Sequence, residues 1–251
     1  MHPDVHEVLR AFTPARIAPG RTGHSLPTQA LLHFNLDHAR ARDAVHSALN
    51  VPDLLESLRA LHPDVRHLRS QARDRREYLL RPDLGRTLRE ESARHLTATG
   101  NRPPATDLSL VLADGLSAQA VNAHALPVLR RLLPRLFEAG WSLAPLVLVE
   151  QGRVAVADDV AYRLGAEMTL ILLGERPGLT SPDSLGAYLT YAPRPGLTDE
   201  ARNCVSNIRP EGLSYELAAA KLFWLLSEMK TRRLSGVDLK DEMPAGRLGA
   251  G

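Results

Sequence analysis

The sequence predicts an α/β protein built on a parallel sheet that is covered by helices on both faces. From Leu108 onward, short apolar runs alternate with amphipathic stretches in the order strand, helix, strand, helix, strand, which is typical of βαβ units. The run from Met168 to Gly174, MTLILLG, is almost continuously apolar, as in a strand that is buried on both faces. With 251 residues, of which 44% are hydrophobic, the chain is long enough to form a sizeable core.

The first part of the chain, residues 1–104, is expected to be helical. Residues 1–26 contain several proline and glycine residues and little periodicity, which indicates an arm. Helices are expected at residues 28–50 and 53–61, because apolar side chains recur there at helical spacing. The stretch NRPPA at residues 101–105 is the clearest linker signal, so we place a domain boundary after residue 104.

The second part, residues 105–235, is expected to carry the sheet, and residues 236–251 to form a loose tail. Residues 152–156 are a hairpin return or a loop. Pro127 and Pro134 must kink or split the first long helix of this part. The expected strands are residues 108–113, 143–149, 168–174 and 187–191. The expected helices are residues 117–137, 158–164 and 213–233.

Composition argues against several classes of protein. The formal net charge of +2 is too small to imply nucleic-acid binding by itself. The chain has no apolar run of about 18 residues, the length of a membrane-spanning helix, and no signal peptide at its start. Its single cysteine, Cys204, cannot form an intrachain disulfide, which fits a reducing compartment. We therefore expect a soluble, cytoplasmic protein.

No nucleotide or metal motif stands out. The first strand-to-helix turn, ADGLSA at residues 113–118, matches neither G-x-G-x-x-G nor the G-x-x-x-x-G-K-[ST] phosphate loop. Asp114 lies at its strand end without a second acidic residue beside it, which argues against a phospho-acceptor site. The histidines at 33 and 38, and those at 62 and 67, are five residues apart, whereas helical metal pairs prefer three or four.

Two polar stretches are candidates for ligand binding. Glu175 and Arg176 follow the apolar run directly, and in open α/β sheets ligands bind just outside the carboxyl ends of the strands. A solvated strand end with a surface ion pair accounts for the same pattern, and spacing alone favours it. RNCVSNIRPEGLSYELAA, residues 202–219, predicts a polar loop before the last helix, suited either to an amide- or phosphate-bearing ligand or to ordinary capping.

A catalytic interpretation of the only thiol also remains open at this point. Cys204 as nucleophile and His124 as base would make the chain a stand-alone α/β thiol hydrolase. The residues around Cys204 lack the small-residue elbow that usually exposes a nucleophile, and a lone cysteine is more often a packing residue.

Longer motifs carry a resemblance to a known family. They include GHSLPTQALLHFNLDHARARDAVHSAL, ARDRREYLLRPDLGRTL and LVLADGLSAQAVNAHA, then GERPGL at residues 174–179 and AYLTYAPRPGLTDEARNCVSNIRPEGLSYELAA at residues 187–219. The last two are the most specific. With them, the chain resembles the small (light) subunit family of ethanolamine ammonia-lyase over most of its length.

This resemblance implies a Rossmann-like fold and a shared enzyme. The family converts ethanolamine to acetaldehyde and ammonia by adenosylcobalamin-dependent radical chemistry. The large subunit, a TIM barrel, holds the substrate and the catalytic groups, in a mixed oligomer of six large and six small subunits. This chain is then expected to be inactive alone, with residues 1–104 wrapping the partner, and a bacterial microcompartment is one expected location.

The resemblance also implies the contacts with the cofactor. In the family they fall at the Val of GRV, the Glu of GERP and the Cys of RNC, which are Val154, Glu175 and Cys204 here. No catalytic residue and no metal ligand is expected from this chain. The motif D-x-H-x-x-G, whose histidine replaces the cofactor's own base on cobalt in many cobalamin domains, does not occur, which fits base-on binding.

Overall fold

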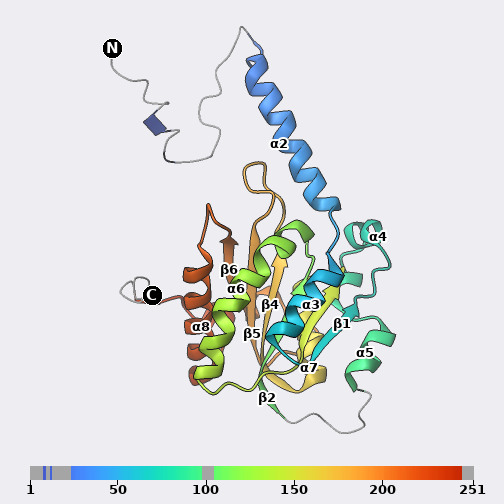
Figure 1. The fold of residues 1–251 in the computed structure, drawn as a ribbon, viewed down its shortest axis with the longest axis vertical. Helices are drawn as coiled ribbons and strands as arrows, with labels where there is room; N and C mark the ends of the chain where they lie inside the picture. The colour runs from blue at the N-terminus through green and yellow to red at the C-terminus, as the bar shows by residue number, and fades with distance from the viewer. Residues whose placement is uncertain (1–7, 10–11, 13–23, 98–104, 245–251) are drawn as a thin grey trace.

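A six-stranded mixed sheet forms the centre of the protein in the computed structural model, which describes residues 8, 9, 12, 24–97 and 105–244 (Figure 1). The strand order is β1-β3-β2-β4-β5-β6. The first four strands in this order are parallel, and β5 and β6 are antiparallel to their neighbours. The strands are β1 (Val65–Arg69), β2 (Thr106–Ala113), β3 (Leu146–Glu150), β4 (Ala166–Gly174), β5 (Leu185–Tyr191) and β6 (Arg202–Ile208).

The α/β class is confirmed, but the expectation of a wholly parallel sheet is wrong. Residues 175–184 join β4 to β5 without a helix, and so short a connection returns the chain antiparallel to itself. The predicted loop at the start of residues 202–219 is also wrong, because β6 pairs with β5 there. Only Arg202, Val205 and Ile208 of β6 are buried, so its sequence lacks the continuous apolar run of a central strand.

Strand β1 lies in the part of the chain that was expected to be helical. Its sequence, VRHLR, has only two apolar residues, because it pairs on one side only, with β3. Helix α3 (Val51–Leu61) also joins the core through Leu54 and Leu58. The boundary placed after residue 104 therefore does not coincide with a break in the core, and residues 101–104 of the expected linker lie outside the described residues.

Helices cover both faces of the sheet, as expected (Figure 1). On one face, α3, α6 (Ala118–Glu138) and α8 (Tyr215–Arg232) form the larger hydrophobic cluster. On the other face, α5 (Glu90–Thr97) and α7 (Val156–Leu164) form the smaller one. The central strand β2 serves both faces, because Leu110 and Leu112 point into the first cluster and Val111 and Ala113 into the second.

Helix α6 is continuous through both of its prolines, so of the two predicted outcomes, a kink or a split, the split does not occur. Ser117 caps its first turn by accepting a hydrogen bond from the Ala120 amide at 3.3 Å. Pro127 and Pro134 lie outside the buried face of the helix. The apolar face between them packs into the core and offsets the cost of two interior prolines, about 3 kcal/mol each.

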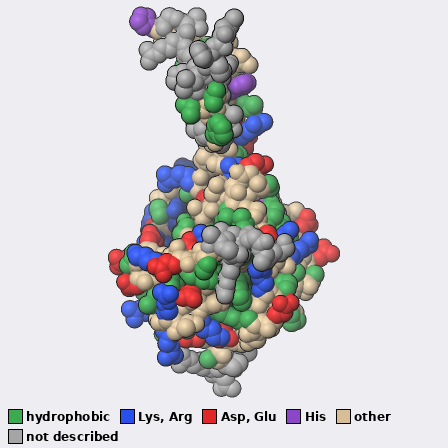
Figure 2. All heavy atoms as spheres, turned by 90° about the vertical axis from the view of Figure 1, so that its left-hand side faces the viewer, with side chains coloured by type: hydrophobic (Ala, Val, Ile, Leu, Met, Phe, Trp, Pro, Cys, Tyr) green, Lys and Arg blue, Asp and Glu red, His purple; other side chains and the backbone are tan. Residues whose placement is uncertain are grey.

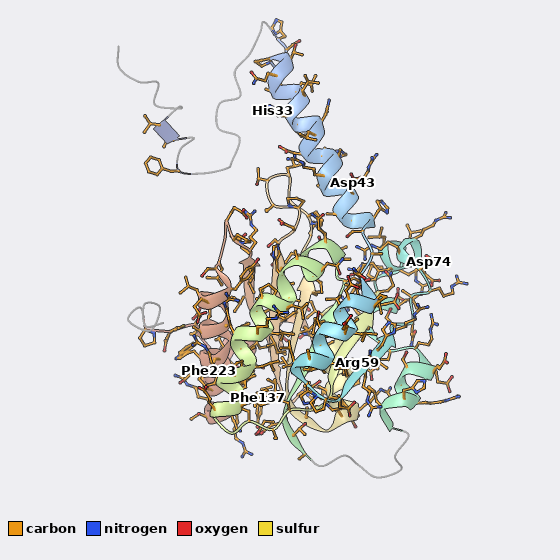
Figure 3. The ribbon with its side chains drawn as sticks, viewed as in Figure 1. His33, Asp43, Arg59, Asp74, Phe137 and Phe223 are labelled. Atoms are coloured by element: carbon orange, nitrogen blue, oxygen red, sulfur yellow. The ribbon has the colours of Figure 1, made fainter. Side chains whose placement is uncertain are left out.

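Helix α2 (Thr28–His46) confirms the first predicted helix and projects away from the body of the protein (Figure 1). Ala44, near its end, is its only buried residue. His33 and Asp43, labelled in Figure 3, lie along this projecting helix. The remaining short elements are α4 (Arg75–Leu80), η1 (Leu84–Arg86), η2 (Asp199–Ala201) and η3 (Gly236–Asp238).

The two ends of the chain are only partly described. Most of the arm expected at residues 1–26, and residues 245–251 of the expected tail, lie outside the described residues. The start of that tail is ordered against the body, with Leu239 buried. Of the helices in the described ranges, none combines the length and apolar character that crossing a membrane requires.

Candidate functional site

A hollow of about 500 Å³ lies at the carboxyl edge of the parallel strands, and we call it the first hollow. Val154, in the turn between β3 and α7, and Glu175, directly after β4, both line it. Two of the three residues expected to contact a cofactor therefore meet, although they are distant in the chain. The other lining residues are Tyr78, Gly115, Leu116, Arg153, Leu173, Gly174, Arg176 and Tyr188.

Glu175 is held in place through one of its carboxylate oxygens. Oε2 accepts a hydrogen bond from the backbone amide of Asn207 at 3.2 Å and another from the Ser184 hydroxyl. The side chain lies against Gly186, where an added Cβ would come within 2.9 Å of the Glu175 Cγ. Its Oε1 accepts no hydrogen bond from the described residues, so this oxygen is free to accept one from a ligand.

Cys204 lies beside the first hollow. It is the cross-strand partner of Tyr188, and the two side chains share a hydrogen bond. Cys204 is an exposed residue, but neighbouring atoms partly shield its thiol from water and raise the thiol's pKa, and the nearby carboxylate of Glu175 raises that pKa further. Burial is also the main cause of the raised pKa of Tyr188. Both groups therefore stay protonated and uncharged near neutral pH, which suits contact with a largely apolar ligand.

Two glycines bring the walls of the first hollow together. Gly115 has a φ of +56°, and a Cβ there would lie 2.3 Å from the carbonyl oxygen of Gly174. The backbone amide of Leu116 donates to that same oxygen at 2.8 Å. The turn after β2 and the end of β4 are thus in backbone contact, which leaves space for a ligand above them rather than between them.

Asp114 joins the ends of two strands. Its Oδ1 and Oδ2 accept hydrogen bonds from the amides of Gly152 and Gln151, both at 2.9 Å. Arg75 lies 3.9 Å from Oδ2. Burial nevertheless raises the pKa of the Asp114 carboxyl to about 6. Both carboxylate oxygens of Asp114 accept hydrogen bonds from backbone amides, so the structure gives this side chain a structural role. This arrangement supports the argument against a phospho-acceptor site.

Tyr78 and two arginines form a cluster under the first hollow that the sequence pattern did not predict. Tyr78 is buried, and the guanidinium carbons of Arg75 and Arg153 lie 4.7 and 4.5 Å from its ring centroid. Arg75 also donates to the carbonyl oxygens of Val45, at the end of α2, and Gly115. Two family motifs contain its members, since ARDRREYLLRPDLGRTL includes Arg75 and Tyr78 and GRV includes Arg153, but neither motif shows that these residues meet.

Cys204 and His124 do not form a dyad. Cross-strand partners share one face of a sheet, and the partner of Cys204, Tyr188, packs on the α7 face. His124 belongs to α6, which covers the opposite face. There its ring lies 2.8 Å from the Tyr215 hydroxyl and 3.3 Å from an Asp183 carboxylate oxygen. The arrangement required by the thiol hydrolase interpretation is therefore absent.

Comparison with known proteins identifies the family. The family model for the ethanolamine ammonia-lyase light chain (EutC) matches residues 3–240. The chain belongs to the ethanolamine ammonia-lyase light-chain family. It is 61% identical to the ethanolamine ammonia-lyase small subunit of Azotobacter vinelandii over 249 residues, covering 97% of this chain and 91% of that one.

Further ethanolamine ammonia-lyase small subunits are nearly as similar. That of Pseudomonas putida (strain W619) is 57% identical over 235 residues, which are 93% of this chain and 86% of that protein. That of Rhodopseudomonas palustris (strain BisA53) is 55% identical over 242 residues, or 96% and 92% of the two chains. The resemblance inferred from the sequence motifs is thereby confirmed, and a light chain of a two-subunit lyase has a large-subunit partner.

Proposed function

We propose that this chain is the cofactor-holding small subunit of an ethanolamine ammonia-lyase, which converts ethanolamine to acetaldehyde and ammonia. The observation that carries the proposal is the meeting of three segments at one edge of the sheet. Val154 and Glu175 line the first hollow. Cys204 shares a hydrogen bond with Tyr188, and Tyr188 also lines the first hollow. The ethanolamine ammonia-lyase family generally depends on adenosylcobalamin, and we assign Val154, Glu175 and Cys204 as its contacts on this chain.

The chemistry of the first hollow fits such a cofactor. A corrin ring is broad and apolar, with neutral amide side chains at its rim. Leu116, Val154 and Leu173 offer apolar surface, and the free Oε1 of Glu175 can accept from an amide N–H. Nη1 of Arg153 makes no hydrogen bond to the described residues, so a donor is available for a ligand oxygen.

The residues of this chain position and shield rather than react. When bound, adenosylcobalamin would supply the radical chemistry of the reaction. Glu175 orients the rim of the ring, while Val154 and Cys204 exclude water from the face against which they pack. No group of this chain acts on ethanolamine in this proposal, and the chain alone is therefore inactive.

Helix α2 is the part of the chain best suited to contact the large subunit. Its end is fixed beside the first hollow, because Arg75 donates to both Val45 and Gly115, at 2.6 and 2.8 Å. Figure 2 shows hydrophobic side chains along the projecting helix. A surface of this kind is typical of an interaction site. Its exposed large apolar residues are Leu31, Leu32, Phe34 and Leu36.

We extend the proposal to the assembly. The large subunit is a TIM barrel that holds ethanolamine and covers the cofactor from the opposite side, in an oligomer of six large and six small subunits. The single cysteine fits the reducing cytoplasm, and a bacterial microcompartment within it is one location for the enzyme.

Reconstitution tests the proposal. We expect the purified chain to give no acetaldehyde from ethanolamine with adenosylcobalamin. Turnover should appear when the large subunit is added, and it should saturate at a fixed ratio of the two chains. Ethanolamine turnover by this chain alone would contradict the proposal, as would full turnover and full cobalamin affinity of the large subunit without it.

A further inference from the structure

A buried histidine that the proposed site does not use lies on α6. His124 is only 5% exposed, and each of its ring nitrogens has a partner on another segment of the chain. Nε2 lies 3.3 Å from a carboxylate oxygen of Asp183, and Nδ1 lies 2.8 Å from the hydroxyl oxygen of Tyr215. A carboxylate can only accept, so Nε2 donates to Asp183, and Nδ1 of the neutral ring accepts from Tyr215. His124 therefore joins two segments that are distant in the chain.

The first of these partners lies in the loop between β4 and β5. Asp183 directly precedes Ser184, whose hydroxyl donates to Oε2 of Glu175. The carbonyl oxygen of Ser184 accepts from the backbone amide of Glu175 at 2.9 Å. From α6, His124 thus fixes the neighbour of the residue that holds both the backbone and the carboxylate of Glu175.

The second partner, Tyr215, is the first residue of α8. The strand before this helix, β6, contains Asn207, whose backbone amide donates to the same oxygen of Glu175 at 3.2 Å. The carbonyl oxygen of Asn207 accepts from the amide of Leu213 at 2.7 Å, which closes the turn between β6 and α8. This turn is closely packed, because a Cβ on Gly212 would lie 2.3 Å from that carbonyl oxygen. The position of Tyr215 is therefore coupled to that of Asn207.

We propose that His124 is a positioning residue for Glu175, and that it acts by tying both of these segments to α6. This inference rests on the proposed function. His124 is not among the residues that line the first hollow, so its effect on cofactor binding must pass through the two segments. Ser117 donates to the carbonyl oxygen of Pro182 at 3.0 Å, which keeps the loop on α6 when His124 is changed. Loss of His124 should therefore displace the carboxylate of Glu175 without unfolding this edge of the sheet.

The test is a double-mutant cycle on the reconstituted complex of large and small subunits. Equilibrium binding of adenosylcobalamin is followed by difference absorption, without substrate, for His124→Leu, Glu175→Ala and the double variant. We expect His124→Leu to weaken binding about fivefold in the parent but less than about twofold in the Glu175→Ala background, because His124 acts only through that carboxylate. His124→Gln keeps a donor and an acceptor, so it should restore most of the affinity.

Two milder variants test the two partners separately. Tyr215→Phe removes one hydroxyl and Asp183→Ala removes one partly exposed carboxylate. Each should cause part of the loss in the parent and almost none in the Glu175→Ala background, even if His124→Leu folds poorly. Tyr191→Phe is the matched control and should bind normally, because the hydroxyl that it removes bonds to Glu167 at 2.9 Å, near the opposite end of β4.

The outcomes distinguish this inference from the proposed function. Full affinity in the His124, Tyr215 and Asp183 variants, or the same factor of loss in both backgrounds, would overturn the inference. The proposed function would then stand, provided that Glu175→Ala alone still weakens binding. Full affinity of Glu175→Ala would overturn both.

Discussion

Gly174, the last residue of β4, lies in direct backbone contact with Ser117, the N-cap of α6. A Cβ built on Gly174 would lie 1.9 Å from the carbonyl oxygen of Ser117 and 2.8 Å from its amide nitrogen. The contact places Glu175 at the floor of the turn between β2 and α6, and it requires glycine because no side chain fits there.

We expect Gly174→Ala to disrupt the carboxyl edge of the sheet. The clash is with backbone, which cannot rotate away, so the variant should lose several kcal/mol of unfolding free energy or fail to fold. Gly140→Ala is the matched control, since a Cβ there meets nothing within 4 Å and only its positive φ is penalised, by about 1–2 kcal/mol. Similar urea midpoints for the two variants would show that the close approach is not structurally important.

How well the sequence predicted each part depended on how local its signal was. Strand β4 was recognised because both of its faces are buried, which leaves a continuous apolar run. The edge strands β1 and β6 were missed because each has charged or polar residues at its exposed positions. Arg153 and Tyr78 are 75 positions apart, and only the folded chain shows their contact.

The site could be predicted only through the resemblance. Spacing alone favoured a solvated strand end at Glu175, because one charged residue after a strand carries no information about its neighbours. Its hydrogen bonds come from residues 184 and 207, which are brought to it by the antiparallel return of β5 and β6. The mixed sheet that the sequence did not predict is therefore what assembles the proposed site.

The ion pair between Arg202 and Asp158 should be important for stability. Both side chains are buried, at 2% and 1% relative exposure, and burial raises the pKa of Asp158 despite its partner. We expect Arg202→Met to cost about 3–5 kcal/mol in urea unfolding, because it leaves a carboxylate buried without its cation. Adding Asp158→Leu should recover part of this loss. Arg232→Met, which breaks a more exposed pair with Glu228, should cost far less, and equal costs would contradict this account.

Asp114 should make stability depend on pH between about 4 and 6. Its pKa in the folded protein is about 6, above its ordinary value of 3.8, so the folded state binds this proton more tightly than the unfolded state. The stabilising contribution is complete below pH 3.8 and is lost as pH rises through 6. Asp114→Asn should be less stable, since an amide cannot accept from both Gln151 and Gly152, and should lack this component of the pH dependence. Identical slopes for variant and parent would contradict the assignment.

Helix α2 should be important for assembly but not for folding. Leu32 is 61% exposed, so Leu32→Gln should change the unfolding free energy of this chain by no more than about 0.5 kcal/mol. Association with the large subunit, measured by analytical ultracentrifugation, should weaken about tenfold or more if this side chain is buried in the interface. Val237→Gln, at an equally exposed apolar position on η3, is the control and should have no effect on association. Full assembly by the Leu32 variant would exclude this part of α2 from the interface.

The affinity of the reconstituted complex for adenosylcobalamin, compared between Glu175→Gln and the parent, tests the central proposal most directly. The matched control is Glu167→Gln, near the opposite end of the same strand. If Glu175 accepts a hydrogen bond from the cofactor, its substitution should cost on the order of 1–3 kcal/mol in binding. Subunit association should change much less, and the control should bind normally. Unchanged cofactor affinity in Glu175→Gln, or an equal loss in subunit association, would contradict the proposal that this chain holds the cofactor at the first hollow.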